Sequence, residues 1–155
     1  MSLENFTDIV NVTLEKMSDI VLCALVVWRE ARNQTLQCQA AVAHSILNRV
    51  HKPSWWGNDV TSVVFRKWQY SSVTDPKDRQ LTTWPRTKEK SWMDCLKVVF
   101  DVMNGDLPNP VPGADSYYDT SISPPYWATP ATFVKQIGKI RFHNLDADYE
   151  SELLN

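Results

Sequence analysis

The chain has 155 residues, 43% of them hydrophobic, and a formal net charge of −2 at pH 7. This length predicts a single domain over residues 1–155 with a sizeable core. The 16 Lys and Arg residues form no basic block, so the sequence does not favour nucleic acid as a partner. The longest apolar run, from Ile20 to Trp28, is much shorter than the ~20 residues of a membrane-spanning helix, so we expect no membrane insertion.

The cysteines and the N-terminus indicate the compartment. Cys23, Cys38 and Cys95 are odd in number and form no CxxC pair, which disfavours a disulfide framework or a zinc knuckle and favours three core residues. The opening residues, MSLENFTDIVNVTLEKMSD, lack the basic start of a secretory signal. We therefore expect the chain to be made and kept in the cytosol.

Helical patterns dominate the first third of the chain. Apolar residues recur at helical spacing over residues 6–17, and Ser18 or Asp19 is a candidate cap for a second helix that runs to about Arg32. Thr35 is the candidate cap of a third helix, which ends near the fragment HKPSWWG. The alanines of this third helix predict close packing against the second.

Residues 52–88 contain four helix breakers and predict one short helix near residues 59–66, followed by a long irregular segment. Trp68, Tyr70 and Trp84 lie in that segment, and a long loop with such aromatics is usually functional.

Residues 88–104 predict another helix, and Gly105 is its candidate left-handed stop. In the last third, the fragment KIRFHNL predicts a short strand. The fold class is therefore mainly α, with long irregular loops and at most a small β element.

Glu30 stands at the end of the apolar second helix. Burial there, together with the negative pole of the helix dipole, would raise the pKa of its carboxyl group. A carboxylic acid that is protonated near neutrality is what glycoside cleavage needs to protonate a leaving sugar oxygen. The competing interpretation is that Glu30 pairs with Arg29, Arg32 or Arg49 at the surface.

The fragment EARNQTLQCQAAVAHSILNRV, residues 30–50, resembles the opening motif of the spore-cortex-lytic (SleB-type) cell-wall hydrolases. This family includes phage endolysins and cleaves the glycan strands of peptidoglycan. Its pattern is E-A-R-G-E followed by G-x-x-A-V-A-x-x-I-L-N-R-V. The matching residues are Glu30, Ala31, Arg32, Ala41, Val42, Ala43, Ile46, Leu47, Asn48, Arg49 and Val50.

Further motifs resemble the family in the same order along nearly the whole chain. The family's Q-F-S resembles residues 69–71, its G-A-x-x-Y-Y and P-P-x-W-A resemble parts of residues 113–128, and its closing I-G-x-H-x-F resembles IGKIRF. Three positions depart from the pattern: Asn33 replaces a glycine, Gln34 the second glutamate, and Ile140 the closing histidine. Roles of that glutamate and that histidine are therefore not carried over.

The resemblance implies a lysozyme-like fold and lytic transglycosylase chemistry on the bond between N-acetylmuramic acid and N-acetylglucosamine. Glu30 would protonate the bridging oxygen, and its carboxylate would then accept the proton of the sugar's 6-hydroxyl as a 1,6-anhydro ring closes. This chemistry needs no cofactor. The alternative is a lysozyme-type muramidase, in which a second carboxylate lies about 5 Å away or further. The available acids are Asp59, Asp75, Asp78, Asp115 and Asp119.

Seven residues are predicted to bind the sugar. Gln69, Tyr70 and Ser71 match a family motif, and their polar groups suit the amide and hydroxyl groups of a glycan. Tyr117 and Tyr118 would point in opposite directions on an extended segment, so that one is buried while the other donates a hydrogen bond near Glu30. The remaining two are candidate platforms for a pyranose face, Trp68 and Trp127.

Two interpretations lie outside glycosidase chemistry. Cys38 with His44 could form a thiol peptidase or amidase pair, although six residues on one helix place them poorly for this. The protein could also be a non-catalytic glycan-binding phage protein in which Glu30 is structural.

His44 and His51 lie seven residues apart, unlike the usual zinc pair on a helix, so we expect no metal.

The expected biological setting follows from the family and from the lack of a signal sequence. We expect a monomeric phage endolysin whose partner is the peptidoglycan glycan strand, held in the host cytoplasm until a holin-type lesion releases it to the wall.

Overall fold

The computed structural model describes residues 14–52, 56–67 and 69–146. Trp68, one of the predicted sugar-binding residues, lies outside this part, as do residues 6–13 of the first predicted helix.

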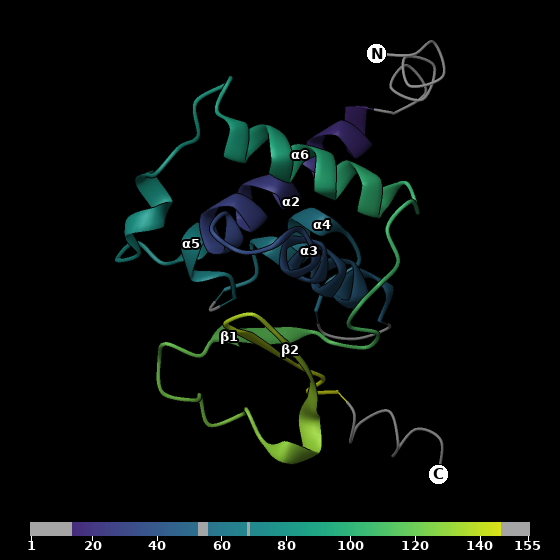
Figure 1. The fold of residues 1–155 in the computed structure, drawn as a ribbon, viewed down its shortest axis with the longest axis vertical. Helices are drawn as coiled ribbons and strands as arrows, with labels where there is room; N and C mark the ends of the chain where they lie inside the picture. The colour runs from purple at the N-terminus through teal and green to yellow at the C-terminus, as the bar shows by residue number, and fades with distance from the viewer. Residues whose placement is uncertain (1–13, 53–55, 68, 147–155) are drawn as a thin grey trace.

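Three helices pack against one another in the upper part of Figure 1: α2 (Leu14–Ala31), α3 (Leu36–His51) and α6 (Lys90–Met103). The short helix α4 (Val60–Val64) contacts both α2 and α3. Among the helices that the structure describes, none is both long enough and apolar enough to cross a membrane. Small and β-branched side chains fill the space between the helices, which lets their axes approach closely. These buried residues include Cys23, Ala24, Val26, Val27, Ala41, Val42, Ala43, Val63, Val64 and Val99.

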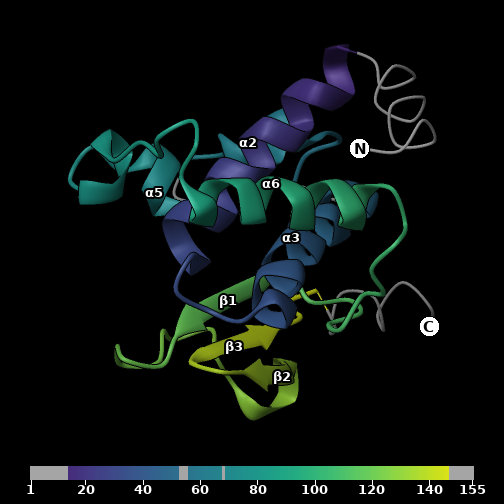
Figure 2. The ribbon, with the colours of Figure 1, turned by 45° about the horizontal axis from the view of Figure 1, so that its top comes forward.

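A three-stranded antiparallel sheet lies beneath the helices, with β3 (Ile140–His143) between β1 (Ser116–Asp119) and β2 (Phe133–Ile137) (Figure 2). The 3-10 helix η2 (Pro130–Thr132) precedes β2, and Gly138, with φ of 57°, permits the tight turn from β2 to β3. The strand predicted in KIRFHNL is confirmed. The fold class, mainly helical with a small sheet, is also confirmed.

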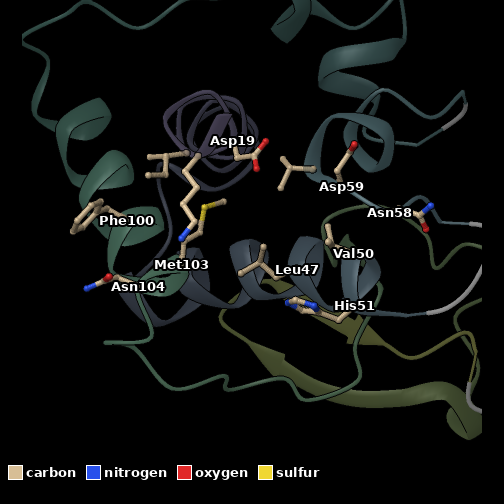
Figure 3. A pocket seen from close by; sticks show the side chains of 12 residues that line it. Asp19, Leu47, Val50, His51, Asn58, Asp59, Phe100, Met103 and Asn104 are labelled. Atoms are coloured by element: carbon tan, nitrogen blue, oxygen red, sulfur yellow. The ribbon is translucent and has the colours of Figure 1, made fainter. Parts of the chain in front are cut away.

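Two predicted helix boundaries are confirmed and one is wrong. Thr35 Oγ1 accepts a hydrogen bond from the backbone N–H of Cys38 at 3.2 Å and caps α3, and Gly105 follows α6 with φ of 82°. The predicted break at Ser18 or Asp19 does not exist, because α2 continues through both residues without a glycine or proline to interrupt it. The side chain of Asp19 lines a cavity between the helices instead of capping one (Figure 3).

The connection from α4 to α6 runs through α5 (Ser71–Thr74) and the 3-10 helix η1 (Arg79–Thr82). Arg29, in the last turn of α2, is buried and binds this connection through three hydrogen bonds. The acceptors are the carbonyl oxygens of Ser72 at 2.9 Å, Leu81 at 3.1 Å and Thr83 at 3.2 Å. The residue before Glu30 therefore ties the irregular segment to the helix end.

The C-terminal part of α3 holds the segment that leads into β1. Asn48 Nδ2 donates to the carbonyl oxygen of Ala114 at 2.8 Å, and Arg49 Nε donates to that of Asp115 at 2.5 Å. Lys52 Nζ forms an ion pair with Asp115 Oδ2 at 2.8 Å, in which the aspartate side chain is fully buried. These contacts dock the sheet against the helices and fix the position of β1.

Candidate active site

Glu30 is partly buried in the last turn of α2 and lines a cavity of about 510 Å³. The walls come from the C-terminal part of α3, the start of α5, β1 and the loop after β1, so segments distant in sequence converge there. The lining residues are Glu30, Arg49, Trp56, Gln69, Tyr70, Ser71, Ser116, Tyr117, Tyr126, Trp127 and Leu145.

Six of the predicted site residues line this one cavity: Glu30, Gln69, Tyr70, Ser71, Tyr117 and Trp127. Tyr118 does not belong to its lining in the described part of the chain. Its ring packs against Trp127 and His143, with ring centroids 6.0 and 5.9 Å apart. The two tyrosines of β1 thus have different surroundings, as the alternation along an extended strand predicts.

The hydroxyl group of Tyr117 donates a hydrogen bond to Glu30 Oε2. Tyr117 pairs with Phe142 in the register of β1 and β3, and its ring packs against the rings of Phe142 and Tyr70 at centroid distances of 5.7 and 6.4 Å. Burial and the neighbouring Glu30 hold the pKa of Tyr117 well above its ordinary value of 10. The hydroxyl group therefore keeps its proton near neutrality and acts as a donor.

The pKa of Glu30 is raised from its ordinary value of 4.5 to about 7. Burial is the largest cause, and the negative charge of Asp78 raises the pKa further. The hydrogen bond from Tyr117 and the positive charge of Arg49 act in the opposite direction, because both stabilise the carboxylate. With a pKa near neutrality, the same group can donate a proton and then accept one.

Two of the three arginines that could have neutralised Glu30 at the surface have other partners. Arg29 binds the three carbonyl oxygens described above, and Arg32 donates to the Trp28 carbonyl at 3.0 Å and to Gln80 Oε1 at 3.0 Å. Within the described residues no ion pair joins Glu30 to an arginine. The interpretation of Glu30 as a surface salt-bridge residue is therefore not supported.

Glu30 is the one carboxylic acid among the described residues that line the cavity. Of the five candidate second acids, Asp115 is buried against Lys52. The other four accept hydrogen bonds from backbone N–H groups: Asp59 from Ser62, Asp75 from Lys77, Asp78 from Gln80 and Asp119 from Ser121. Asp78 also accepts a hydrogen bond from Ser71 Oγ at 2.8 Å.

Sequence reasoning missed several lining residues, foremost Arg49 and Trp56. In the sequence Arg49 is only a motif match and a candidate surface partner of Glu30, whereas in the structure its guanidinium carbon lies 4.1 Å from the centroid of Trp56 at the cavity wall. The adjacent tryptophans in PSWWG were a usable signal for Trp56. Trp28, two residues before Glu30, donates from Nε1 to Ser91 Oγ at 2.9 Å instead of lining the cavity.

The other hypotheses find little support in the described residues. Burial raises the pKa of the Cys38 thiol to about 11, and His44 Nε2 contacts the Leu107 carbonyl oxygen at 3.1 Å instead of the thiol. No group of three or more His, Cys, Asp or Glu side chains in this part of the chain is arranged to hold a metal ion. A separate cavity of about 330 Å³ lies among α2, α3 and α6 and is lined by His51 and Asp59 but not by Glu30 (Figure 3).

Comparison with known proteins identifies the family. A family model described as "Cell Wall Hydrolase" matches residues 33–143. The chain therefore belongs to the cell wall hydrolase family, as the sequence motifs indicated.

Two similar proteins are spore cortex-lytic enzymes. The one from Halalkalibacterium halodurans is 34% identical over 130 residues, which cover 82% of this chain and 35% of that protein. The one from Bacillus subtilis is 33% identical over 124 residues, which cover 79% of this chain and 36% of that protein. The chain thus spans about a third of the length of these curated relatives.

Two solved structures share the fold. The catalytic domain of the germination-specific lytic transglycosylase SleB from Bacillus anthracis matches with a TM-score of 0.65 at 28% identity, covering 86% of this chain and 97% of that one. The catalytic domain of the Bacillus cereus SleB protein matches with a TM-score of 0.65 at 31% identity, covering 82% and 90%. This likeness confirms the SleB-type, lysozyme-like fold expected from the motifs.

Proposed function

We propose that the protein is a peptidoglycan lytic transglycosylase that cleaves the bond between N-acetylmuramic acid and N-acetylglucosamine. The observation that carries this proposal is the carboxyl group of Glu30, the one acid among the described residues that line a cavity of about 510 Å³. Burial raises its pKa to about 7, and it accepts a hydrogen bond from Tyr117. The similarity to a lytic transglycosylase catalytic domain supports the same reaction class.

In the proposed reaction Glu30 first acts as the acid. Its proton passes to the bridging oxygen while the bond from the muramic acid C1 to that oxygen breaks, and N-acetylglucosamine leaves with a new hydroxyl group. The 6-hydroxyl oxygen of the muramic acid then bonds to C1, and the Glu30 carboxylate accepts its proton. The 1,6-anhydro product forms without water, and Glu30 returns to its starting state.

Tyr117 has a distinct role in this sequence. It donates a hydrogen bond to the Glu30 carboxylate, which stabilises the charged form that arises after the first proton transfer. Aromatic side chains at the cavity, among them Trp127 and Tyr126, offer faces for the sugar rings.

The test uses purified peptidoglycan and mass spectrometry of the released fragments. The protein should release fragments that end in 1,6-anhydro-N-acetylmuramic acid, and Glu30→Gln, which keeps the shape of the side chain, should abolish the release. If Glu30→Gln releases fragments at the unaltered rate, Glu30 is not the acid. If the unaltered protein binds wall material but releases nothing, it is a glycan-binding protein.

The second candidate is a muramidase, and the observation in its favour is the effect of the Asp78 charge on Glu30. The charge of Asp78 reaches Glu30 and helps raise its pKa, although Asp78 does not line the cavity. Reducing N-acetylmuramic acid ends among the products, with loss of activity in Asp78→Asn, would establish hydrolysis with Asp78 as the second acid.

The setting we propose is that of a phage endolysin, which acts as a monomer and waits in the host cytoplasm for a holin-type lesion. The support is the resemblance of the motifs to a family that includes phage endolysins. Expression in the bacterial cytoplasm should leave cells intact until the membrane is permeabilised, and lysis should then depend on Glu30. Lysis without permeabilisation would contradict this setting, and light scattering after size-exclusion chromatography measures the oligomeric state.

A further inference from the structure

Arg49 is a buried cation in the wall of the Glu30 cavity, and only 5% of its surface is exposed. Its Nε donates to the carbonyl oxygen of Asp115, and its guanidinium carbon lies 4.1 Å from the ring centroid of Trp56 and 4.8 Å from that of Tyr70. Its Nη1 atom is also buried but has no hydrogen-bond partner among the described residues. An unpaired charged donor is costly inside a protein, so its place at a cavity indicates an acceptor supplied by a ligand.

A second unpaired donor stands beside it. Tyr70 is 8% exposed, lines the same cavity, and its hydroxyl group has no partner in the described part of the chain. Its backbone φ of 45° lies in the left-handed region, which is costly for a large side chain and is the only such value among the described non-glycine residues. The Q-F-S motif that this segment resembles has phenylalanine here, so the hydroxyl group is a difference of this chain.

We propose that Arg49 and Tyr70 together bind the carboxyl oxygen of the lactyl ether on N-acetylmuramic acid. This inference rests on the proposed function, because it assumes that muramic acid lies next to Glu30. The lactyl group is what distinguishes the two alternating sugars, and in a strand without peptide stems it carries the negative charge of the glycan. A guanidinium group that is held by stacking and offers only donors suits that acceptor.

The acetamido group that both sugars carry is a poorer match for this pair. It presents both a donor and an acceptor and has no charge. The side-chain amide of Gln69, which lines the same cavity, also presents both and suits that group. Arg49 and Tyr70 would thus select muramic acid, whereas Gln69 would bind either sugar.

The test measures binding by calorimetry in a Glu30→Gln background, so that the ligand stays intact. Three ligands are used: a stem-free tetrasaccharide of alternating N-acetylglucosamine and N-acetylmuramic acid, the same tetrasaccharide with peptide stems, and an N-acetylglucosamine tetramer. Arg49→Gln should weaken binding of the stem-free muramic ligand by about tenfold to a hundredfold and that of the tetramer by less than about twofold. Tyr70→Phe keeps the ring and should show the same selectivity with a loss of about fivefold.

A matched control is Arg32→Gln, since Arg32 also stacks on an aromatic ring, that of Trp28 at 4.3 Å, but does not line the cavity. It should leave all three affinities unchanged. Equal losses of affinity for the muramic ligands and for the tetramer would overturn the inference and indicate that the pair binds the acetamido group. Unchanged affinities in Tyr70→Phe and in folded Arg49→Gln would show that neither residue binds the glycan. If Arg49→Gln does not fold, the affinities of Tyr70→Phe alone decide between these outcomes.

The ligand with peptide stems distinguishes the two forms of the lactyl group. A loss with both muramic ligands shows that the amide carbonyl oxygen is bound as well as the carboxylate, and a loss with the stem-free ligand alone shows that the charge is required. Either result supports the lactyl assignment. Failure of the proposed function is a separate observation, namely that the unaltered protein releases no fragments from peptidoglycan.

Discussion

Replacement of Tyr117 by phenylalanine tests how the site sets the acidity of Glu30. The substitution removes the hydroxyl group that donates to Glu30 Oε2 and keeps the ring that packs against Phe142 and Tyr70. Since the hydrogen bond stabilises the carboxylate, its loss must raise the pKa of Glu30 above about 7.

The size of the change follows from the strength of the bond. A hydrogen bond to a charged group contributes about 1.5 to 3 kcal/mol, and one pKa unit corresponds to about 1.4 kcal/mol. The bond therefore accounts for about one to two units. Because Glu30 lines an open cavity and water can replace part of the lost bond, we expect a rise of about one unit in Tyr117→Phe.

The assay is the pH dependence of kcat/KM on solubilised glycan strands. The proposed reaction starts from protonated Glu30, so kcat/KM should fall as the pH rises through its pKa, and this fall should move upward by about one pH unit in Tyr117→Phe. Tyr118→Phe is the matched control, because Tyr118 lies next to Tyr117 on β1 but packs against Trp127. A fall that stays in place, or moves to lower pH, in Tyr117→Phe would refute this account of the site.

Three further predictions concern charge. Asp78→Asn removes a negative charge that raises the pKa of Glu30, so this pKa should fall and the high-pH decrease of kcat/KM should move to lower pH. The control Asp75→Asn should leave the decrease at the same pH. Glu30→Gln should stabilise the protein against urea by about 2 to 3 kcal/mol near pH 8 but not near pH 4. The pKa of Glu30 is about 7 in the folded protein and 4.5 in the unfolded chain, so its ionisation lowers the stability as the pH rises between these two values. Lys52→Met removes the cation that pairs with the buried carboxylates of Asp115 and Asp146, and it should lower the free energy of unfolding by about 3 kcal/mol. Equal stability to the unaltered protein would contradict a stabilising role of these ion pairs.

The sequence predicted the parts of the fold that depend on local patterns. Thr35 and Gly105 mark helix ends because capping and left-handed backbone depend on a few neighbouring residues. Glu30 stood out because an acid at the end of an apolar helix is unusual. The break at Ser18 or Asp19 was wrong because good cap residues do not end a helix whose apolar pattern continues.

What the sequence did not predict depends on contacts between distant segments. The strand β1 was not predicted, because only its pairing with the distant β3 defines it. The place of Arg49 in the cavity wall was not predicted, because nothing local shows that its guanidinium group reaches a cavity closed by Tyr70 and Trp56. The hydrogen bond between Glu30 and Tyr117 joins residues 87 positions apart, and only the docked sheet brings them together.

The chemistry of the site therefore depends on docking between the two parts of the fold. The helices supply the acid, and the sheet supplies the hydrogen-bond donor that limits how far burial raises its pKa. Asp115, which forms the ion pair with Lys52, lies two residues before Tyr117 on the same segment. The ion pair therefore holds Tyr117 within reach of Glu30. Looser docking would remove this donor, which raises the pKa of Glu30. It would also expose the carboxyl group to water, which lowers the pKa. A firmly docked sheet thus keeps Tyr117 in place to stabilise the Glu30 carboxylate that the proposed reaction forms.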